Sequence, residues 1–263
     1  MNHRGGWALI KNTWQSWLQH RGFFFLLAFG WMLPLLVYML VWSVAAGEGS
    51  LEGFSQETLA GYYLILILSN QLTYPITNWT VGDNIRMGQI NRWLIQPMSP
   101  LYHALSAEIA GKVVFMLFSI PVTGLMAFLI QPKININIIQ VVLFIPALLL
   151  AWVLRFFWGY WLALLAFWAT RADSLLALQD SFIFLVGGHL APIHLLPDWL
   201  QSIARLLPFR YMSAFPVEIL TGQLTGTETL LGFIVLTIWS ITAILLYRFI
   251  WRRGVRHYEA VGG

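Results

Sequence analysis

The sequence predicts an all-α polytopic membrane protein with six transmembrane helices, and three observations support this. First, 59% of the 263 residues are hydrophobic and 10% are charged, whereas roughly 25% are charged in an ordinary soluble domain. Second, uncharged runs are long enough to cross a bilayer, which takes roughly 20 residues. Third, basic residues are shared unequally between the two sides that these runs define. We interpret residues 1–263 as a single transmembrane domain.

The apolar runs define the spans. They predict transmembrane helices at about 23–46, 58–79, 105–131, 138–168, 173–191 and 228–250. The fourth contains Arg155, but it has too few residues for two crossings and a turn, so one long or tilted helix is predicted. The fifth is the least apolar, because Asp180 and His189 lie within it.

Lysine and arginine residues orient these spans. Ten lie in residues 1–22, the loop near 80–104, the turn near 170 and the end of the chain, against Lys133, Arg205 and Arg210 on the other side. Cytoplasmic loops are enriched in such residues. Both termini, including the tail 251–263, are therefore predicted to be cytoplasmic. The net charge of +4 follows from this asymmetry and does not indicate nucleic-acid binding.

Residues 1–22 form a predicted amphipathic helix before the first span. Its apolar positions are Trp7, Ile10, Trp14, Trp17 and Leu18. Tryptophan suits the boundary between lipid and water, where its ring is apolar and its N–H stays hydrated. Two interpretations stay open: a simple anchor for the first span, or an elbow helix that transmits movement of a cytoplasmic partner.

The predicted cytoplasmic loop 80–104 mixes charged and apolar residues. A short helix is expected before Pro97, with Arg86 and Arg92 on its hydrated side. A solvated loop does not need its apolar groups, so they indicate lipid contact or a docking surface for another protein, and we favour docking. The candidate contact residues are Arg86, Met87, Gly88, Ile90, Arg92, Trp93, Leu94 and Pro97.

Residues 191–225 lie outside the membrane by the parity of the spans, yet they are rich in proline and apolar residues. Pro197 suits the first turn of a helix that Pro208 would end, and Gly222 would close a second short helix. Such helices are too short to cross the membrane, so re-entrant helices are predicted between spans five and six. The candidate residues of an outer gate are Pro192, Pro197, Trp199, Pro208, Phe209, Tyr211, Pro216 and Gly222.

Three ionisable residues, Arg155, Asp180 and His189, lie inside the predicted spans. Each costs roughly 2.5 to 3.5 kcal/mol at the bilayer centre unless it is paired or hydrated. Counting residues from the cytoplasmic turn places Arg155 and Asp180 about 9 Å apart in depth, so a direct pair is not expected. A structural role and a place in a substrate path remain alternatives for each residue.

Several catalytic motifs are missing. There is no phosphate-binding loop of the G-x-x-x-x-G-K-[ST] type, so the chain is not expected to bind ATP itself. There is no cysteine, and the scattered histidines form no recognisable metal motif. We therefore predict no metal, no cofactor and no catalytic residue in this chain.

Four segments carry a resemblance to a known family. They are RMGQINRWLIQPMSP at 86–100, AFW at 166–168, LPFRY with FPVEILTG between 207 and 222, and the tail RHYEAVGG. Together they resemble permeases of the type-2 class of ABC exporters, in a short bacterial branch without a large outer domain. The resemblance extends over essentially the whole chain.

The resemblance implies a function and a set of partners. Two permeases, identical or related, would join two separate ATPase subunits that bind ATP and Mg²⁺ in the bacterial plasma membrane. Nucleotide-driven closure would push on the loop 80–104 and on the elbow helix. The spans would then open outward and release a substrate, such as a drug-like, lipidic or other amphipathic molecule.

Two other classes of function remain as alternatives. An ion- or proton-coupled secondary transporter or a channel would use Arg155, Asp180 and His189 as its ion path. An intramembrane enzyme acting on lipid would use Glu108, Asp180 and His189 as general acids or bases. The enzyme is disfavoured because these three residues are predicted at different depths.

Overall fold

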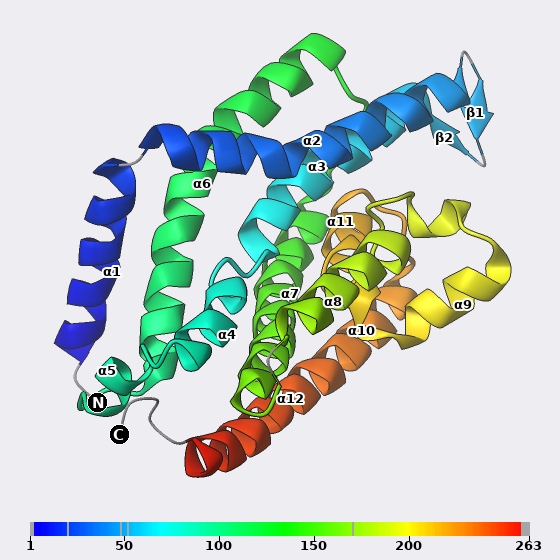
Figure 1. Cartoon of the computed structure of the whole chain (residues 1–263). Helices are drawn as coiled ribbons and strands as arrows, with labels where there is room; N and C mark the ends of the chain where they lie inside the picture. Colours follow the sequence, from blue (N-terminus) through cyan, green and yellow to red (C-terminus); the bar gives the residue numbers. More distant parts are fainter. Residues whose placement is uncertain (1–2, 20, 48, 52, 170, 259–263) are drawn as a thin grey trace.

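The computed structural model describes residues 3–19, 21–47, 49–51, 53–169 and 171–258, and Figure 1 shows their arrangement. Within these ranges the regular structure is helical, as the sequence predicts, apart from one short hairpin that the sequence analysis did not predict. The hairpin pairs β1 (Ser50–Leu51) with β2 (Phe54–Ser55). The helices are α1 (His3–Gln19), α2 (Arg21–Ala46), α3 (Gln56–Thr73), α4 (Asn78–Arg86), α5 (Asn91–Leu94), α6 (Pro100–Ile130), α7 (Ile138–Leu164), η1 (Leu165–Phe167), α8 (Asp173–Val186), η2 (Ile193–Leu195), α9 (Asp198–Leu206), α10 (Pro208–Tyr211), α11 (Ala214–Leu220) and α12 (Gly226–His257).

Four of the described helices are long and apolar enough to cross a membrane: Gly22–Ala46, Pro100–Ile130, Ile138–Phe167 and Gly226–His257. Large apolar side chains on these helices are exposed, among them Leu40, Phe128 and Ile138. Such a surface suits contact with lipid. Helices α3 and α8 are shorter, with 18 and 14 residues. At about 1.5 Å per residue they are roughly 27 and 21 Å long.

Local sequence explains where several helices begin. Ser55 accepts a hydrogen bond from the backbone N–H of Thr58 at the start of α3. Asn137 with Gln140 begins α7, and Thr225 with Glu228 begins α12, each as a reciprocal capping box. In a capping box two backbone N–H groups that the helix leaves free obtain partners. The sequence thereby sets the start of each of these three helices.

The helix ends differ from the predicted segments in four places. Helix α8 ends at Val186 instead of continuing to about 191, so His189 lies after the helix. Helix α3 ends at Thr73 instead of continuing to about 79, because Pro75 disfavours a helical conformation of the residue before it. The predicted loop 80–104 contains most of α4, all of α5 and the first turn of α6. Helix α12 continues to His257, well into the predicted tail 251–263. Residues 259–263 of that tail lie outside the described residues.

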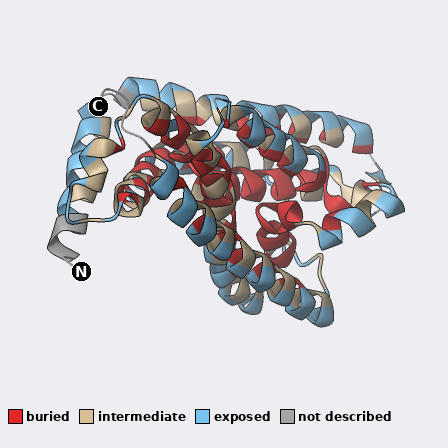
Figure 2. Cartoon of the chain, turned by 60° about the horizontal axis from the view of Figure 1, so that its bottom comes forward, coloured by how far each residue is buried: buried red, intermediate tan, exposed pale blue. Residues whose placement is uncertain are grey.

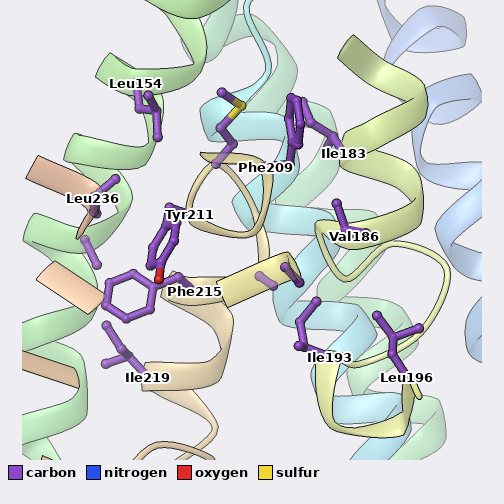
Figure 3. Packing of buried hydrophobic residues seen from close by; sticks show 14 of the residues in the cluster. Leu154, Ile183, Val186, Ile193, Leu196, Phe209, Tyr211, Phe215, Ile219 and Leu236 are labelled. Atoms are coloured by element: carbon purple, nitrogen blue, oxygen red, sulfur yellow. The ribbon is translucent and has the colours of Figure 1, made fainter. Parts of the chain in front are cut away.

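Helix α7 lies at the centre of the molecule and packs against α3, α4, α8, α11 and α12. Buried side chains of the described residues form three clusters. Figure 2 colours the buried residues red, and they gather in the interior of the helical bundle. Figure 3 shows part of one cluster, in which the rings of Tyr211 and Phe215 point toward Leu236 and Ile219 lies beside Phe215. The short helices α10 and α11 are therefore part of the core, wedged between α7, α8 and α12.

Candidate functional site

The connection between α3 and α4 is held by an ion pair on α6. Glu108 is fully buried and accepts hydrogen bonds from the backbone N–H of Thr77 at 2.7 Å and from its hydroxyl at 2.8 Å. Lys112 donates to the carbonyl oxygen of Tyr74 at 2.5 Å and lies 3.2 Å from Glu108. A helix leaves carbonyls free at its end and N–H groups free at its start. The pair supplies both kinds of partner where the chain leaves α3 and enters α4.

The candidate contact residues of the predicted cytoplasmic loop divide into exposed and buried groups. Met87, Arg92 and Pro97 are exposed, Trp93 and Leu94 are half-buried, and Gly88 forms a turn with φ +70. Ile90 is only 2% exposed, so it belongs to the core and does not form part of an exposed surface. Ile95, which sequence analysis did not select, is 86% exposed. The predicted short helix is interrupted at Gly88, and only α5 follows it.

Arg86 joins this segment to α8. The side chain, at the end of α4, forms ion pairs with Asp83 of its own helix and with Asp173, the first residue of α8, at 3.2 Å. Its hydrogen bond with Asp83 raises the pKa of Arg86 above its ordinary value. Arg86 is therefore part of a contact between α4 and α8 and is not simply a solvated charge.

Some apolar side chains of α1 pack against the rest of the protein, and others are exposed. Trp17 stacks on Phe24 with ring centroids 4.4 Å apart and covers Gly111 of α6. Ile10 and Leu18 are half-buried, whereas Trp7 and Trp14 are exposed. Helix α1 lies beside α6 (Figure 1). One part of the predicted stripe thus fixes α1 to the body of the molecule.

Arg155, Asp180 and His189 line a single cavity of about 220 Å³ between α2, α3, α7 and α8. The remaining lining residues come mainly from α2 and include three aromatic rings. They are Gly30, Trp31, Pro34, Leu35, Asn70, Tyr74 and Phe184. Glu108 is not among the lining residues, so the acid–base set of the enzyme alternative is not assembled.

Hydrogen bonds tie the cavity to the connection between α3 and α4. Arg155 Nη1 donates to Asn70 at 2.7 Å and to Thr73 at 3.3 Å, and its guanidinium lies over the ring of Tyr74. The hydroxyl of Tyr74 accepts from Trp79 Nε1 at 2.8 Å and donates to Asp180 at 3.4 Å. As predicted, no ion pair joins Arg155 to Asp180.

The predicted outer segment is held by a buried ion pair. Arg210 of α10 donates to Glu218 of α11 from Nη2 at 2.6 Å and from Nε at 3.1 Å. Glu218 is fully buried and Arg210 is 7% exposed. Two parallel N–H donors on one carboxylate give a strong and directional contact.

The predicted gate residues occupy different environments. Pro192, Pro208, Phe209, Tyr211 and Pro216 are buried, whereas Pro197 and Trp199 are exposed. Pro197 precedes α9 instead of lying in its first turn, and Pro208 begins α10. Gly222 follows α11 with φ +72, a conformation that favours glycine. Phe209 and Tyr211 belong to one apolar cluster, and the guanidinium of Arg210 lies over the ring of Tyr211.

Sequence analysis missed the partners of these ionisable residues. Glu218, Tyr74, Thr77 and Asn70 received no role, although each lies within or beside an apolar run. A signal existed for Glu218, because it is a single carboxylate in the apolar stretch 214–220 shortly after Arg210. Tyr74 and Asn70 carry no charge, so nothing distinguished them from ordinary membrane sequence.

Two comparisons with known proteins bear on this arrangement. Residues 31–262 match the family model described as ABC-2 family transporter protein. A search of curated proteins found no match. Among the residues that the structure describes, no cluster of three or more histidine, aspartate or glutamate side chains could hold a metal ion.

Proposed function

We propose a function that proceeds from one established point: the chain belongs to the ABC-2 family of transporter proteins, whose model covers residues 31–262. It is a multi-pass, all-α membrane permease, a transport subunit and not an enzyme. The finer features that follow are our proposal: the topology, the partners, the energy source and the direction of transport.

The proposed topology has six spans, formed by α2, α3, α6, α7, α12 and by α8 together with residues 187–191 that follow it. Helix α1 acts as the elbow, and residues 191–225 form the re-entrant outer segment. Both termini lie in the cytoplasm of a bacterium, whose plasma membrane holds the protein. The excess of basic residues on the side of the termini supports this orientation. Two copies of the permease, or this chain with a related one, assemble with two ATPase subunits that bind ATP and Mg²⁺.

One observation carries the proposal of an ATPase contact. The turn from α4 to α6 exposes Met87, Arg92, Ile95 and Pro97 together, with Met87 68% and Ile95 86% exposed. We call these four residues the docking surface. An exposed apolar patch with a polar rim suits a protein partner. Ile90, within the same segment, is buried in an apolar cluster and anchors the segment to the core.

The structure around the docking surface suggests how movement would pass into the membrane. Arg86 links α4 to α8 through Asp173. At the other end of α4, Thr77 is bound by Glu108 of α6. A push on the docking surface would therefore act on α4, α6 and α8 together, and the cavity between α2 and α8 would open toward the outer side to release substrate.

The experiment replaces exposed residues, so that folding is left intact. In the complex purified with its ATPase, Ile95→Glu together with Met87→Glu should reduce transport-coupled ATP hydrolysis about tenfold or more, because two charges would be desolvated at the contact. Ser202→Glu, which places the same charge at an exposed position of α9 in the proposed outer segment, is the control and should leave coupling unchanged. Unchanged coupling in the double variant would place the contact elsewhere.

A secondary transporter remains the second candidate, because Arg155, Asp180 and His189 line one cavity. The two functions differ in their energy source. Transport by the purified chain in vesicles should require an associated ATPase and Mg²⁺-ATP. Transport that persists without ATP and collapses with the ion gradient would support the secondary transporter and overturn the exporter.

A further inference from the structure

The cavity between α2, α3, α7 and α8 presents one positive and one negative group to the same space. Arg155 reaches it from α7 and Asp180 from α8. Their depths were expected to differ, and no ion pair joins them. The two charges therefore do not neutralise each other directly, although both lie within the helical bundle.

Neither charge has a complete set of partners. Both hydrogen bonds of Arg155 come from Nη1, and Nε is buried without a partner. Asp180 accepts only two long hydrogen bonds, from Tyr74 and from Gln179, each at 3.4 Å. Arg155 is 2% exposed. Charged groups inside a membrane protein are costly unless they are paired, and they commonly mark a ligand path.

The walls and the opening of the cavity limit what it can hold. The rings of Trp31 and Tyr74 lie against each other at 4.5 Å and line the cavity. Gly30 and Pro34 on its rim are exposed on α2, beside the exposed apolar side chains of Leu33 and Val37. A volume of about 220 Å³ is smaller than the roughly 300 to 1,000 Å³ of sites for drug-sized molecules.

From these features we propose that the cavity binds a zwitterionic group, with an anion on Arg155 and an ammonium on Asp180, beside the aromatic rings that line the cavity. Such rings attract cations through their faces. The opening lies on an apolar surface, so the ligand carrying this group enters from the bilayer. The inference rests on the proposed transport function, and it names the chemical class of the substrate. The same chemistry occurs in a lipid head group and in a free amino compound that bears an anionic group.

Three probes separate these chemistries. The full chain, purified in detergent, is titrated with short-chain phosphatidylethanolamine, with short-chain phosphatidylglycerol and with free phosphoethanolamine, and binding is measured by native mass spectrometry. Phosphatidylethanolamine carries both charges and should bind about tenfold more tightly than phosphatidylglycerol, which lacks the ammonium. If phosphoethanolamine binds as tightly as the lipid, the ligand is a free zwitterion and the acyl chains add nothing.

Asp180→Asn is the decisive variant because it removes the negative charge and keeps the shape. It should weaken phosphatidylethanolamine binding about tenfold and leave phosphatidylglycerol binding unchanged. Asp198→Asn, on the exposed start of α9, is the matched control and should bind both probes as wild type does. Arg155→Gln should weaken binding of both probes. If Arg155→Gln does not fold, Asp180→Asn still tests the proposal, because losing this carboxylate should weaken only the binding of a ligand that carries an ammonium.

Two outcomes would overturn the inference: equal binding of both lipids to the wild-type chain, or unchanged phosphatidylethanolamine binding to the Asp180→Asn variant. Failure of the proposed function would look different. The Ile95→Glu, Met87→Glu double variant should bind phosphatidylethanolamine as wild type does, whatever happens to its ATP coupling. If the wild-type chain couples transport to ATP hydrolysis but does not prefer phosphatidylethanolamine, the ligand site alone is overturned. If it prefers phosphatidylethanolamine but its transport does not depend on ATP, the exporter alone is overturned.

Discussion

Two buried ion pairs stabilise two non-spanning parts of the chain in different ways. Glu108 and Lys112 are four residues apart on α6, and each also binds the backbone of another segment, Thr77 and Tyr74 respectively. Arg210 and Glu218 join two adjacent short helices and bind chiefly each other. The first pair supplies hydrogen-bond partners to backbone groups that are left free where α3 ends and α4 begins. The second pair holds α10 against α11. Loss of one partner should therefore be more severe in the second pair.

The largest expected effect is on the Arg210–Glu218 pair. Glu218→Ala would leave a buried guanidinium without its carboxylate, and the free energy of unfolding should fall by about 3 to 5 kcal/mol. Denaturation of the purified protein in mixed micelles measures it. Arg210→Met combined with Glu218→Leu should recover most of the loss, because an apolar pair carries no desolvation cost. A double variant as unstable as Glu218→Ala would contradict this account of the pair.

A smaller loss is expected at the other pair. Glu108→Gln keeps the oxygen that accepts from Thr77 but replaces the oxygen that accepts from Lys112 with an N–H donor, so the charge and one hydrogen bond are lost together. The expected loss is about 1.5 to 3 kcal/mol. The control is Glu57→Gln, because Glu57 pairs with Lys133 at 2.6 Å on the surface. Exposed pairs contribute about 0 to 1 kcal/mol. A Glu108→Gln loss larger than that of Glu218→Ala would reverse the comparison.

The packing of α1 against the connection between α3 and α4 can be tested at one glycine. A Cβ added at Gly111 would lie 2.6 Å from Trp17 and 2.7 Å from Ile76. Overpacking of this kind costs about 1 to 3 kcal/mol, so Gly111→Ala should lower stability and displace α1. Gly124→Ala in the same helix meets nothing within 4 Å and is the matched control. Equal stability of both variants would mean that α1 does not pack on α6 in the membrane.

The smallest effect is expected at Pro208. This residue begins α10 and is buried, and replacing it with alanine costs about 0.4 to 1 kcal/mol through the entropy of the unfolded chain. Limited proteolysis should show a looser segment 191–225, while the ATPase subunits stay bound. Loss of ATPase assembly in this variant would contradict the placement of Pro208 in an outer segment.

Much of the helical framework is predictable from sequence because apolar runs and capping residues act locally. The run 138–168 predicts one long helix, and α7 with η1 covers almost all of it. Pro75 also indicated the end of α3. The sequence analysis nevertheless extended this helix to about 79, because the apolar run continues past the proline. Ile90 shows the limit. Its position in a mixed loop suggested exposure, and only its packing among distant apolar residues reveals that it is buried.

The sequence by itself determined the class of molecule and the approximate positions of its long helices. Composition, run length and local capping are properties of neighbouring residues, and the bilayer requires long apolar helices. Only the tertiary structure decided which polar groups meet. Arg155 of α7 donates a hydrogen bond to Asn70 of α3 and lines the same cavity as Asp180 of α8. Glu108 of α6 accepts a hydrogen bond from Thr77, which precedes α4. A buried charge must obtain a partner, but the sequence does not state which of several distant groups the fold brings to it.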